Sequence, residues 1–408
     1  MNTLTPICHN NTVFNNCTIN NRVSFRGNDQ VDRVELSTEK EGMKKSEKML
    51  LSLLKSGLSG EAPEEKVFAN ATISDWQKVV EMSDKSATTA ILYDGIKSMK
   101  KTSVPAETLI ELEAFKNHTE KEYAKRLQII SELTDKFNAK GVDTIHLKGV
   151  GASMNYPVPN HRYGCDIDIF TRLKGKETTD LSNAYNIADD VMISEGLEVG
   201  SYNNKYAKHS EFNYRGVEVD NHKYFIAKKQ FPYAKELDMY LHKNLNPVEK
   251  ILPNGKKVLV PSKEFNSVFI SHHAFQHHII NELNLHHLID WGMHVKQNGL
   301  QIPEEAKGTK FEEFTYAITN LSNRYLGTNV KVPENKEYED KLMREILHPK
   351  GCKEETEQMN KLELLIHKTK RCFRNAQRIH DLGGNSTFET FGKAALNKFL
   401  HPTTLFVR

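Results

Sequence analysis

The sequence predicts an α+β protein in which a small mixed-sheet core is flanked by N-terminal and C-terminal helical regions. Apolar residues recur at helical spacing in the first and last parts of the chain, whereas the middle alternates short β-like runs with glycine and proline. The 408 residues, 38% of them hydrophobic and 27% charged, suffice for two or three domains with a buried core.

The N-terminal part divides into a tail and a helical region. Residues 1–42 are rich in Asn, Thr and charge and have no sustained apolar period, so we expect a flexible tail. A translation start at Met43 is an open alternative. In residues 43–140 we expect a helical region, which includes a helical segment at 76–96 and ends in a long helix that stops near Gly141.

In residues 141–225 the sequence pattern predicts the mixed α/β core. The predicted order is strand, short helix, strand, helix, strand, strand. The predicted strands occupy residues 142–147, 165–171, 206–214 and 217–224, and the longer helix occupies residues 180–195. A tight turn at Arg215-Gly216 should join the last two strands.

The remainder is a connecting segment and a second helical domain. Residues 226–262 are expected to be irregular, with a hairpin at Pro253-Asn254-Gly255. Residues 263–408 show mostly helical periodicity and are expected to form the C-terminal helical domain.

Composition argues against several classes of protein. No apolar run approaches the roughly 18 to 20 residues that cross a bilayer, and the N-terminus lacks a secretory signal, so we expect a cytoplasmic protein with no membrane partner. Five scattered cysteines predict no disulfide framework. With 56 basic and 53 acidic residues, a dedicated nucleic-acid coat is unlikely. The basic stretch 368–378 is more typical of a solvated helix face, so nucleic-acid contact is open but unsupported.

Two aspartates suggest a metal site. Asp166 and Asp168 are one residue apart on a predicted strand, so both carboxylates point to one face while Ile167 and Ile169 point to the other. Such carboxylates repel each other unless a cation or proton lies between them, and Mg²⁺ prefers oxygen ligands. The alternative is a solvated strand face.

A third carboxylate follows on a later strand. In residues 217–222 the valines form one face, and Glu218, Asp220 and His222 form the other. If this strand lies near the Asp166 strand, Asp220 completes a three-carboxylate site. Such sites hold one or two Mg²⁺ ions, about 4 Å apart when there are two.

Phosphate-binding features precede the aspartates. Lys148-Gly149 lies where a strand passes into a short helix, and glycine lets a phosphate approach the backbone. Lys148 adds a point charge and Arg162 a planar fork; the alternative is a surface charge pair. A dinucleotide-binding turn is disfavoured because Met154 stands at the third glycine position.

These residues resemble a bacterial family of uncharacterised nucleotidyltransferases within the DNA polymerase β-like superfamily. The resemblance covers roughly residues 140–300. It is carried by Leu147-Lys148-Gly149, Tyr156-Pro157, Arg162, Asp166-Ile167-Asp168, Asp220-Asn221-His222 and a His-rich segment that ends in Asp290. The resemblance implies a nucleotidyltransferase-like core at 141–225.

The resemblance also implies a reaction. An acceptor hydroxyl would attack the α-phosphorus of a nucleoside triphosphate, such as ATP, and release pyrophosphate. Asp166, Asp168 and Asp220 would hold Mg²⁺, or Mn²⁺ in its place, and Asp220 would help to deprotonate the acceptor. The nucleotide would be bound by Lys148, Gly149 and Arg162, with His222 as a weaker candidate that supports the metal ligands.

Several alternatives stay open. The wider superfamily usually has Gly-Ser at Lys148-Gly149 and an apolar residue at Asn221. The chain could therefore be a catalytically degenerate fold that serves as a binding or regulatory module, for example a toxin–antitoxin partner. The His-rich segment 272–294 fits buried core histidines, an acceptor pocket or a metal site. The nucleotide, the acceptor and the oligomeric state are not specified.

Overall fold

The computed structural model describes residues 42–100, 104–175, 184–204, 207–228, 230–349 and 359–392. The chain divides into two compact units, Met1–Glu120 and Lys121–Arg408. The expected tail at 1–42 lies, except for Gly42, outside the described residues.

The first unit is helical. Its elements are α1 (Lys45–Ser59), the 3₁₀ turn η1 (Glu65–Phe68), α2 (Ile73–Lys85), α3 (Thr89–Lys97) and the start of the long helix α4 (Ala106–Asn138). The backbones of α1 and α3 approach closely, because a Cβ on Gly95 would lie 2.0 Å from the carbonyl oxygen of Leu53. The helical segment expected at 76–96 is two helices, interrupted near Ala87, which adopts a φ of 54°.

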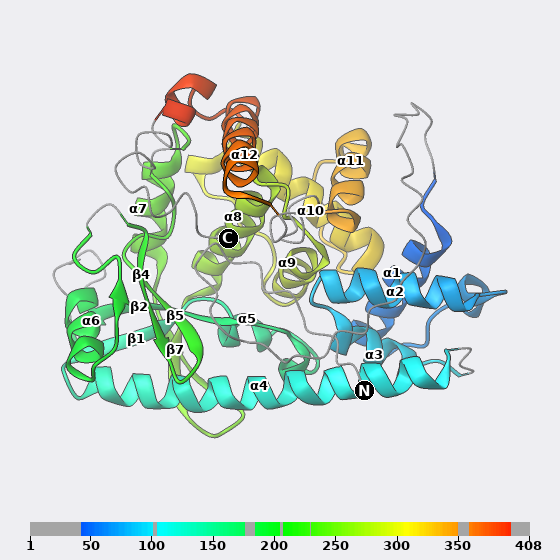
Figure 1. The fold of residues 1–408 in the computed structure, drawn as a ribbon, viewed down its shortest axis with the longest axis horizontal. Coiled ribbons are helices and arrows are strands. Elements are labelled where there is room, and N and C mark those ends of the chain that lie inside the picture. The colour runs from blue at the N-terminus through cyan, green and yellow to red at the C-terminus, as the bar shows by residue number, and fades with distance from the viewer. Residues whose placement is uncertain are drawn as a thin grey trace. The chain divides into compact units, whose positions relative to one another are not determined.

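The second unit is built on one seven-stranded sheet in the part of the chain described (Figure 1). Its strand order is β3-β4-β5-β2-β1-β7-β6. The strands are β1 (Val142–His146), β2 (Asp166–Leu173), β3 (Val199–Gly200), β4 (His209–Tyr214), β5 (Val217–His222), β6 (Val248–Ile251) and β7 (Lys257–Val260). β2 pairs with β1 in antiparallel and with β5 in parallel orientation.

Helices cover both faces of this sheet. On one face, Ile167 and Val219 join a hydrophobic core with the 121–138 part of α4 and with α6 (Ala184–Ser194). On the other face, Phe170 contacts His242 of α7 (Ala234–Asn244), and His222 contacts Phe269 of α8 (Lys263–Ile279). Figure 1 shows α4 along one side of the strands and α8 on the opposite side. Because side chains alternate along β2, Asp166 and Asp168 share the α8 face with Phe170.

Further helical elements complete the described part of the second unit. They are α5 (Val150–Ser153), η2 (Pro159–His161), α9 (Leu285–Asn298), η3 (Glu304–Ala306), α10 (Lys310–Leu326), α11 (Lys336–Leu347) and α12 (Lys361–Asp381). The indole nitrogen of the fully buried Trp291 donates a hydrogen bond to Thr319, at 2.9 Å, and so ties α9 to α10.

The predicted α+β fold with helical flanks is confirmed. The hairpin expected near Pro253 is present, but its strands β6 and β7 extend the sheet, and α7 precedes them in a segment expected to be irregular. The buried Leu237 and Leu241 of α7 are four residues apart, so a helical signal was present in that segment.

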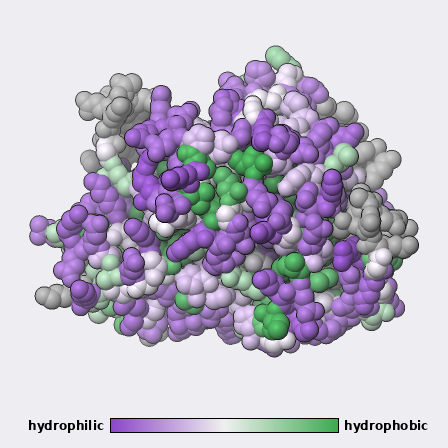
Figure 2. All heavy atoms as spheres, turned by 180° about the vertical axis from the view of Figure 1, so that it is seen from behind, coloured by the Kyte–Doolittle hydropathy of each residue, from purple (hydrophilic) through white to green (hydrophobic). Residues whose placement is uncertain are grey.

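The surface agrees with the charged composition. The face in Figure 2 is mostly hydrophilic, with hydrophobic residues visible only in limited areas. Among the described residues, no helix combines the length and apolarity needed to cross a membrane.

Candidate functional site

Three carboxylates meet on the α8 face of the sheet. Asp166 and Asp168 are on β2, and the parallel register places Asp168 directly beside Asp220 of β5. One carboxylate oxygen from each of the three residues lies within 4.8 Å of the other two. Asp168 and Asp220 are buried, whereas Asp166 is partly exposed. The structure therefore brings together the three acids that the sequence analysis singled out.

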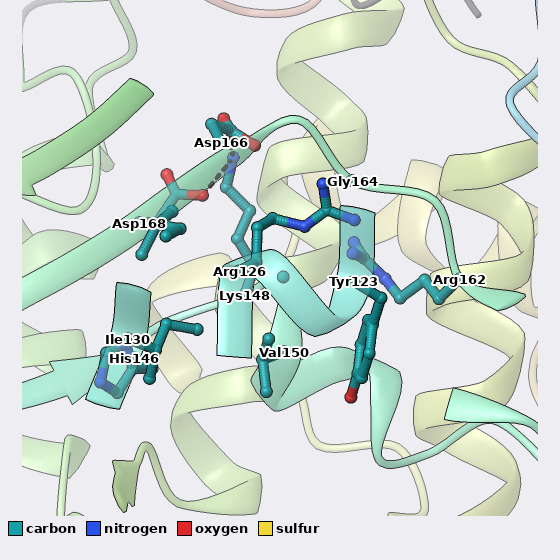
Figure 3. A pocket seen from close by; sticks show the side chains of 12 residues that line it. Tyr123, Arg126, Ile130, His146, Lys148, Val150, Arg162, Gly164, Asp166 and Asp168 are labelled. Atoms are coloured by element: carbon teal, nitrogen blue, oxygen red, sulfur yellow. Dashed lines mark ion pairs between the residues drawn. The ribbon is translucent and has the colours of Figure 1, made fainter. Parts of the chain in front are cut away.

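Lys148 lies against two of these acids. Its Nζ is 3.0 Å from Oδ2 of Asp168 and 3.7 Å from Oδ2 of Asp166, as the dashed lines in Figure 3 show. Burial works against the lysine charge, but the two aspartates outweigh it and raise the pKa of Lys148. Lys148 is thus a buried counter-ion of the acids rather than half of a surface charge pair.

His222 holds the other oxygen of Asp168. Its Nε2 donates a hydrogen bond to Oδ1 of Asp168 at 2.9 Å, and both side chains are almost fully buried. Burial alone would raise the pKa of Asp168, but Lys148 and His222 stabilise the carboxylate and lower it. Burial lowers the pKa of His222, although the hydrogen bond to Asp168 acts in the opposite direction.

Asp220 has the opposite electrostatic environment. Burial, together with repulsion from Asp168 and Asp166, raises the pKa of Asp220 to about 9. Its Oδ1 is buried and accepts no hydrogen bond from any described residue. His209 of β4 approaches its other oxygen, at 3.8 Å. Oδ2 of Asp168 is also buried without a hydrogen bond. Three convergent carboxylates with two such oxygens suit a hard divalent cation, so the residues present fit Mg²⁺.

The turn before the acids is built on a glycine. Gly149 has a φ of 61° and a ψ of −111°, which a residue with a Cβ adopts only under strain. The helix that follows, α5, has only four residues, so it is short as expected. Such a short helix has only a small dipole. The turn therefore lets a phosphate approach the backbone closely, but it adds little electrostatic attraction.

Arg162 is already paired. Its Nε and Nη2 donate to Oδ1 and Oδ2 of Asp290, on α9, at 2.7 Å each. The hydroxyl of Tyr156 donates to the same Oδ1 at 2.6 Å. The Arg162 guanidinium holds the pKa of Asp290 below its usual range, although burial would raise it. The fork that we expected to bind phosphate is therefore occupied by an aspartate 128 residues further along the chain.

Two cations near the site were missed from the sequence. Arg126, on α4, lines the same pocket as Lys148, Arg162 and Asp166 (Figure 3). Lys208, just before β4, is close enough to the acids for electrostatic interaction, and burial lowers its pKa. One signal could have revealed Arg126: it lies three residues after Tyr123 and four before Ile130, on the apolar stripe that buries this helix.

The His-rich helices contain both core residues and a cluster. His272 packs against Phe311, and His294 lies 3.2 Å from the hydroxyl of Ser267, both in buried surroundings. His273 and His277 of α8 and His287 of α9 each place a ring nitrogen within 4.8 Å of the others. These last three residues could hold a transition metal.

One cysteine differs from expectation. Cys165, which directly precedes β2, is disulfide-bonded. Among the described residues the only other cysteine, Cys372, is free. Scattered cysteines without a regular spacing do not reveal such a bond in the sequence.

Comparison with known proteins identifies a family. The family model described as uncharacterised nucleotidyltransferase matches residues 73–327, from the start of α2 to the end of α10 and thus more than half of the chain. The match contains the three acids, Lys148 and the Arg162–Asp290 pair. No curated protein and no solved structure matches the chain. The resemblance to uncharacterised nucleotidyltransferases noted from the sequence is confirmed, and the chain belongs to this family.

Proposed function

We propose that the protein is a Mg²⁺-dependent nucleotidyltransferase that moves a nucleoside monophosphate from a nucleoside triphosphate to an acceptor hydroxyl. The observation that carries the proposal is the convergence of Asp166, Asp168 and Asp220 with a buried, unsatisfied oxygen on Asp220. Membership of a nucleotidyltransferase family supports the reaction class. Cytoplasmic nucleotides would supply the donor, and nucleic acid is an acceptor that no described feature favours.

The acids would hold the metal and accept a proton. Asp166 and Asp168 would ligate Mg²⁺, or Mn²⁺, and Asp220 would complete the ligand set. A cation bound there would neutralise phosphate charge and promote ionisation of the acceptor hydroxyl. The acceptor oxygen would form a bond to the α-phosphorus, its proton would pass to Asp220, and the bond to the β-phosphate oxygen would break to release pyrophosphate.

The other residues would orient these groups. His222 fixes the carboxylate of Asp168 through the 2.9 Å hydrogen bond. Lys148 neutralises Asp166 and Asp168 without metal, and a divalent cation between them would free its ammonium to meet the triphosphate. Gly149 lets the triphosphate approach the backbone. Arg162, held by Asp290, would shape the pocket and add positive potential.

A binding module without catalysis is the weaker candidate. A module that only binds a partner does not need three carboxylates on one site, whereas here all three are present and converge despite their mutual repulsion.

Calorimetry with ATP, GTP, CTP and UTP in the presence of Mg²⁺ tests the proposal. Wild type should bind at least one nucleotide, and the double variant Asp166→Asn/Asp168→Asn should lose binding by tenfold or more. Asp143→Asn is the matched control, because Asp143 lies on β1 and pairs with Arg172 outside the site. If a folded wild type binds none of the four nucleotides, or binds them equally well without metal and acids, the proposal is wrong.

A further inference from the structure

The pocket beside the acids contains three cationic side chains. Arg126 projects from α4, Lys148 follows β1, and Arg162 follows η2. Figure 3 shows the guanidinium of Arg126 between Lys148 and the guanidinium of Arg162. Like charges gathered in one pocket repel one another, so each cation requires compensation by an anion.

Two of the three are compensated within the protein. Lys148 lies against Asp168 and Asp166, and Arg162 makes the two-bond pair with Asp290. Arg126 has neither a hydrogen bond nor an ion pair with any described residue. Its Nη2 is buried without a partner, and the residue is only 5% exposed.

An unpaired guanidinium in this position is unfavourable for the fold. Burial lowers the pKa of Arg126 by more than the nearby Tyr163, Glu122 and Asp166 raise it, and Arg162 lowers it as well. An arginine nevertheless stays protonated in proteins, because its pKa is so high. A buried cation without a counter-ion is among the more destabilising features a chain can carry. A site that retains one is poised to receive an anion.

Phosphate is the anion that the surroundings favour. The guanidinium fork matches the spacing of phosphate oxygens, which it binds through paired hydrogen bonds. Arg126 and Asp166 line the same pocket, with Lys148 lining it as well. A polyphosphate chain that begins at a cation on the acids would therefore extend towards Arg126.

We propose that Arg126 is the principal ligand of the β- and γ-phosphates of the nucleoside triphosphate. This proposal rests on the proposed function and changes which arginine binds the triphosphate, from Arg162 to Arg126. Arg162, whose Nε and Nη2 are held by Asp290, acts as a positioning residue for the pocket wall. Arg126, whose buried Nη2 has no hydrogen-bond partner, binds the phosphate tail.

Inorganic tripolyphosphate isolates this subsite, because it has no base, no sugar and no α-phosphate ester. Its binding should be measured by calorimetry in EDTA with wild type, Arg126→Gln, Arg126→Lys and Arg172→Gln. Arg172 is the matched control, a partly buried arginine on β2 that pairs with Asp143 outside the pocket. We expect Arg126→Gln to lose at least tenfold in affinity, Arg126→Lys to lose less, and Arg172→Gln to match wild type.

A stability measurement separates a binding role from a folding role. Without ligand, Arg126→Gln should melt at the same temperature as wild type or higher, since a buried unpaired charge is removed. Tripolyphosphate should raise the Tm of wild type and leave that of Arg126→Gln unchanged. A variant that binds tripolyphosphate as wild type does, or that unfolds at lower temperature without ligand, overturns the proposal.

The two proposals fail in different ways. If Mg²⁺-dependent nucleotide binding needs the acids but not Arg126, the proposed function stands and the phosphate subsite is wrong. If tripolyphosphate binding needs Arg126 while nucleotide binding ignores the acids, the anion subsite stands and the transferase is wrong. An acidic acceptor in place of phosphate predicts no binding of tripolyphosphate by wild type, which also overturns the subsite.

Discussion

Asp168 and Asp220 lie side by side on parallel strands and have opposite pKa shifts. Both are buried, but Lys148 and His222 stabilise the charge of Asp168, whereas Asp220 has no comparable cation and meets the charges of Asp168 and Asp166. One carboxylate is therefore ionised and its neighbour protonated at neutral pH without metal. Because only one of the two carboxyl groups is charged, we expect the two residues to contribute differently to stability.

Neutralising these two residues should have unequal effects on stability. At pH 7 without metal, Asp168→Asn removes the charge that pairs with Lys148 and should lower the free energy of unfolding by about 3 kcal/mol. Asp220→Asn replaces an already neutral carboxyl group and should change it by less than about 1 kcal/mol. Urea unfolding monitored by circular dichroism measures both. Equal destabilisation by the two variants would contradict the assigned charge states.

Lys148 should be more important for stability without metal than with it. Lys148→Met removes the buried cation that lies against Asp166 and Asp168, so we expect a loss of about 3 kcal/mol in EDTA. Mg²⁺ should recover part of that loss by compensating the same carboxylates. The control is Lys136→Met, which removes a more exposed pair with Glu195 and should cost less than about 1 kcal/mol under either condition. A loss that is the same in Mg²⁺ and in EDTA would argue against a cation site at these acids.

Local patterns predicted the orientation of the acids, but long-range contacts supplied the rest of the site. Side chains alternate along any strand, so the common face of Asp166 and Asp168 follows from two positions in sequence. The parallel pairing that aligns Asp168 with Asp220 depends on which distant strands become neighbours, and it was predicted only as a condition.

The partners of the pocket cations were beyond sequence reasoning for a similar reason. Arg162, in the loop after η2, is neutralised by Asp290 on α9, and no local spacing relates the two residues. Arg126 lies at a position of α4 where the helical period expects an apolar residue, and a single polar residue at such a position is common. Only the structure shows that its Nη2 is buried without a hydrogen-bond partner. The α+β class and the flanking helices could be predicted because their prediction depends only on the periodicity of apolar residues, which is a local property.

The Arg162–Asp290 pair should couple strongly in a double-mutant cycle. Each single variant, Arg162→Met or Asp290→Asn, leaves a buried partner uncompensated and should cost about 3 kcal/mol. The combined variant should be about 2 kcal/mol more stable than the sum of the single losses predicts. Chemical denaturation of the four proteins gives the coupling energy. A coupling near zero would mean that the two side chains do not pair in solution.

Buried histidines should make the protein sensitive to mild acid. Burial lowers the pKa of His146 to about 4, of His272 to about 3 and of His294 to about 4, from a usual value of 6.5. Below pH 6.5 these histidines therefore bind protons in the unfolded chain but stay neutral in the folded protein until the pH falls further. Their stabilising contribution is complete above pH 6.5 and declines as the pH falls, by up to about 1.4 kcal/mol per pH unit for each residue.

Replacement of one of these histidines tests how steeply the free energy of unfolding changes with pH, in addition to its value at one pH. His146→Gln should lower the free energy of unfolding at pH 7.5, because a packed ring is lost, but should make it decline less steeply between pH 6.5 and 4.5. Val142→Ala, in the same strand, should lower stability by a similar core-packing mechanism without altering the slope. Urea titrations at half-unit pH steps resolve the two effects. If His146→Gln and Val142→Ala give parallel curves, His146 does not titrate on unfolding, and its burial in the folded protein is contradicted.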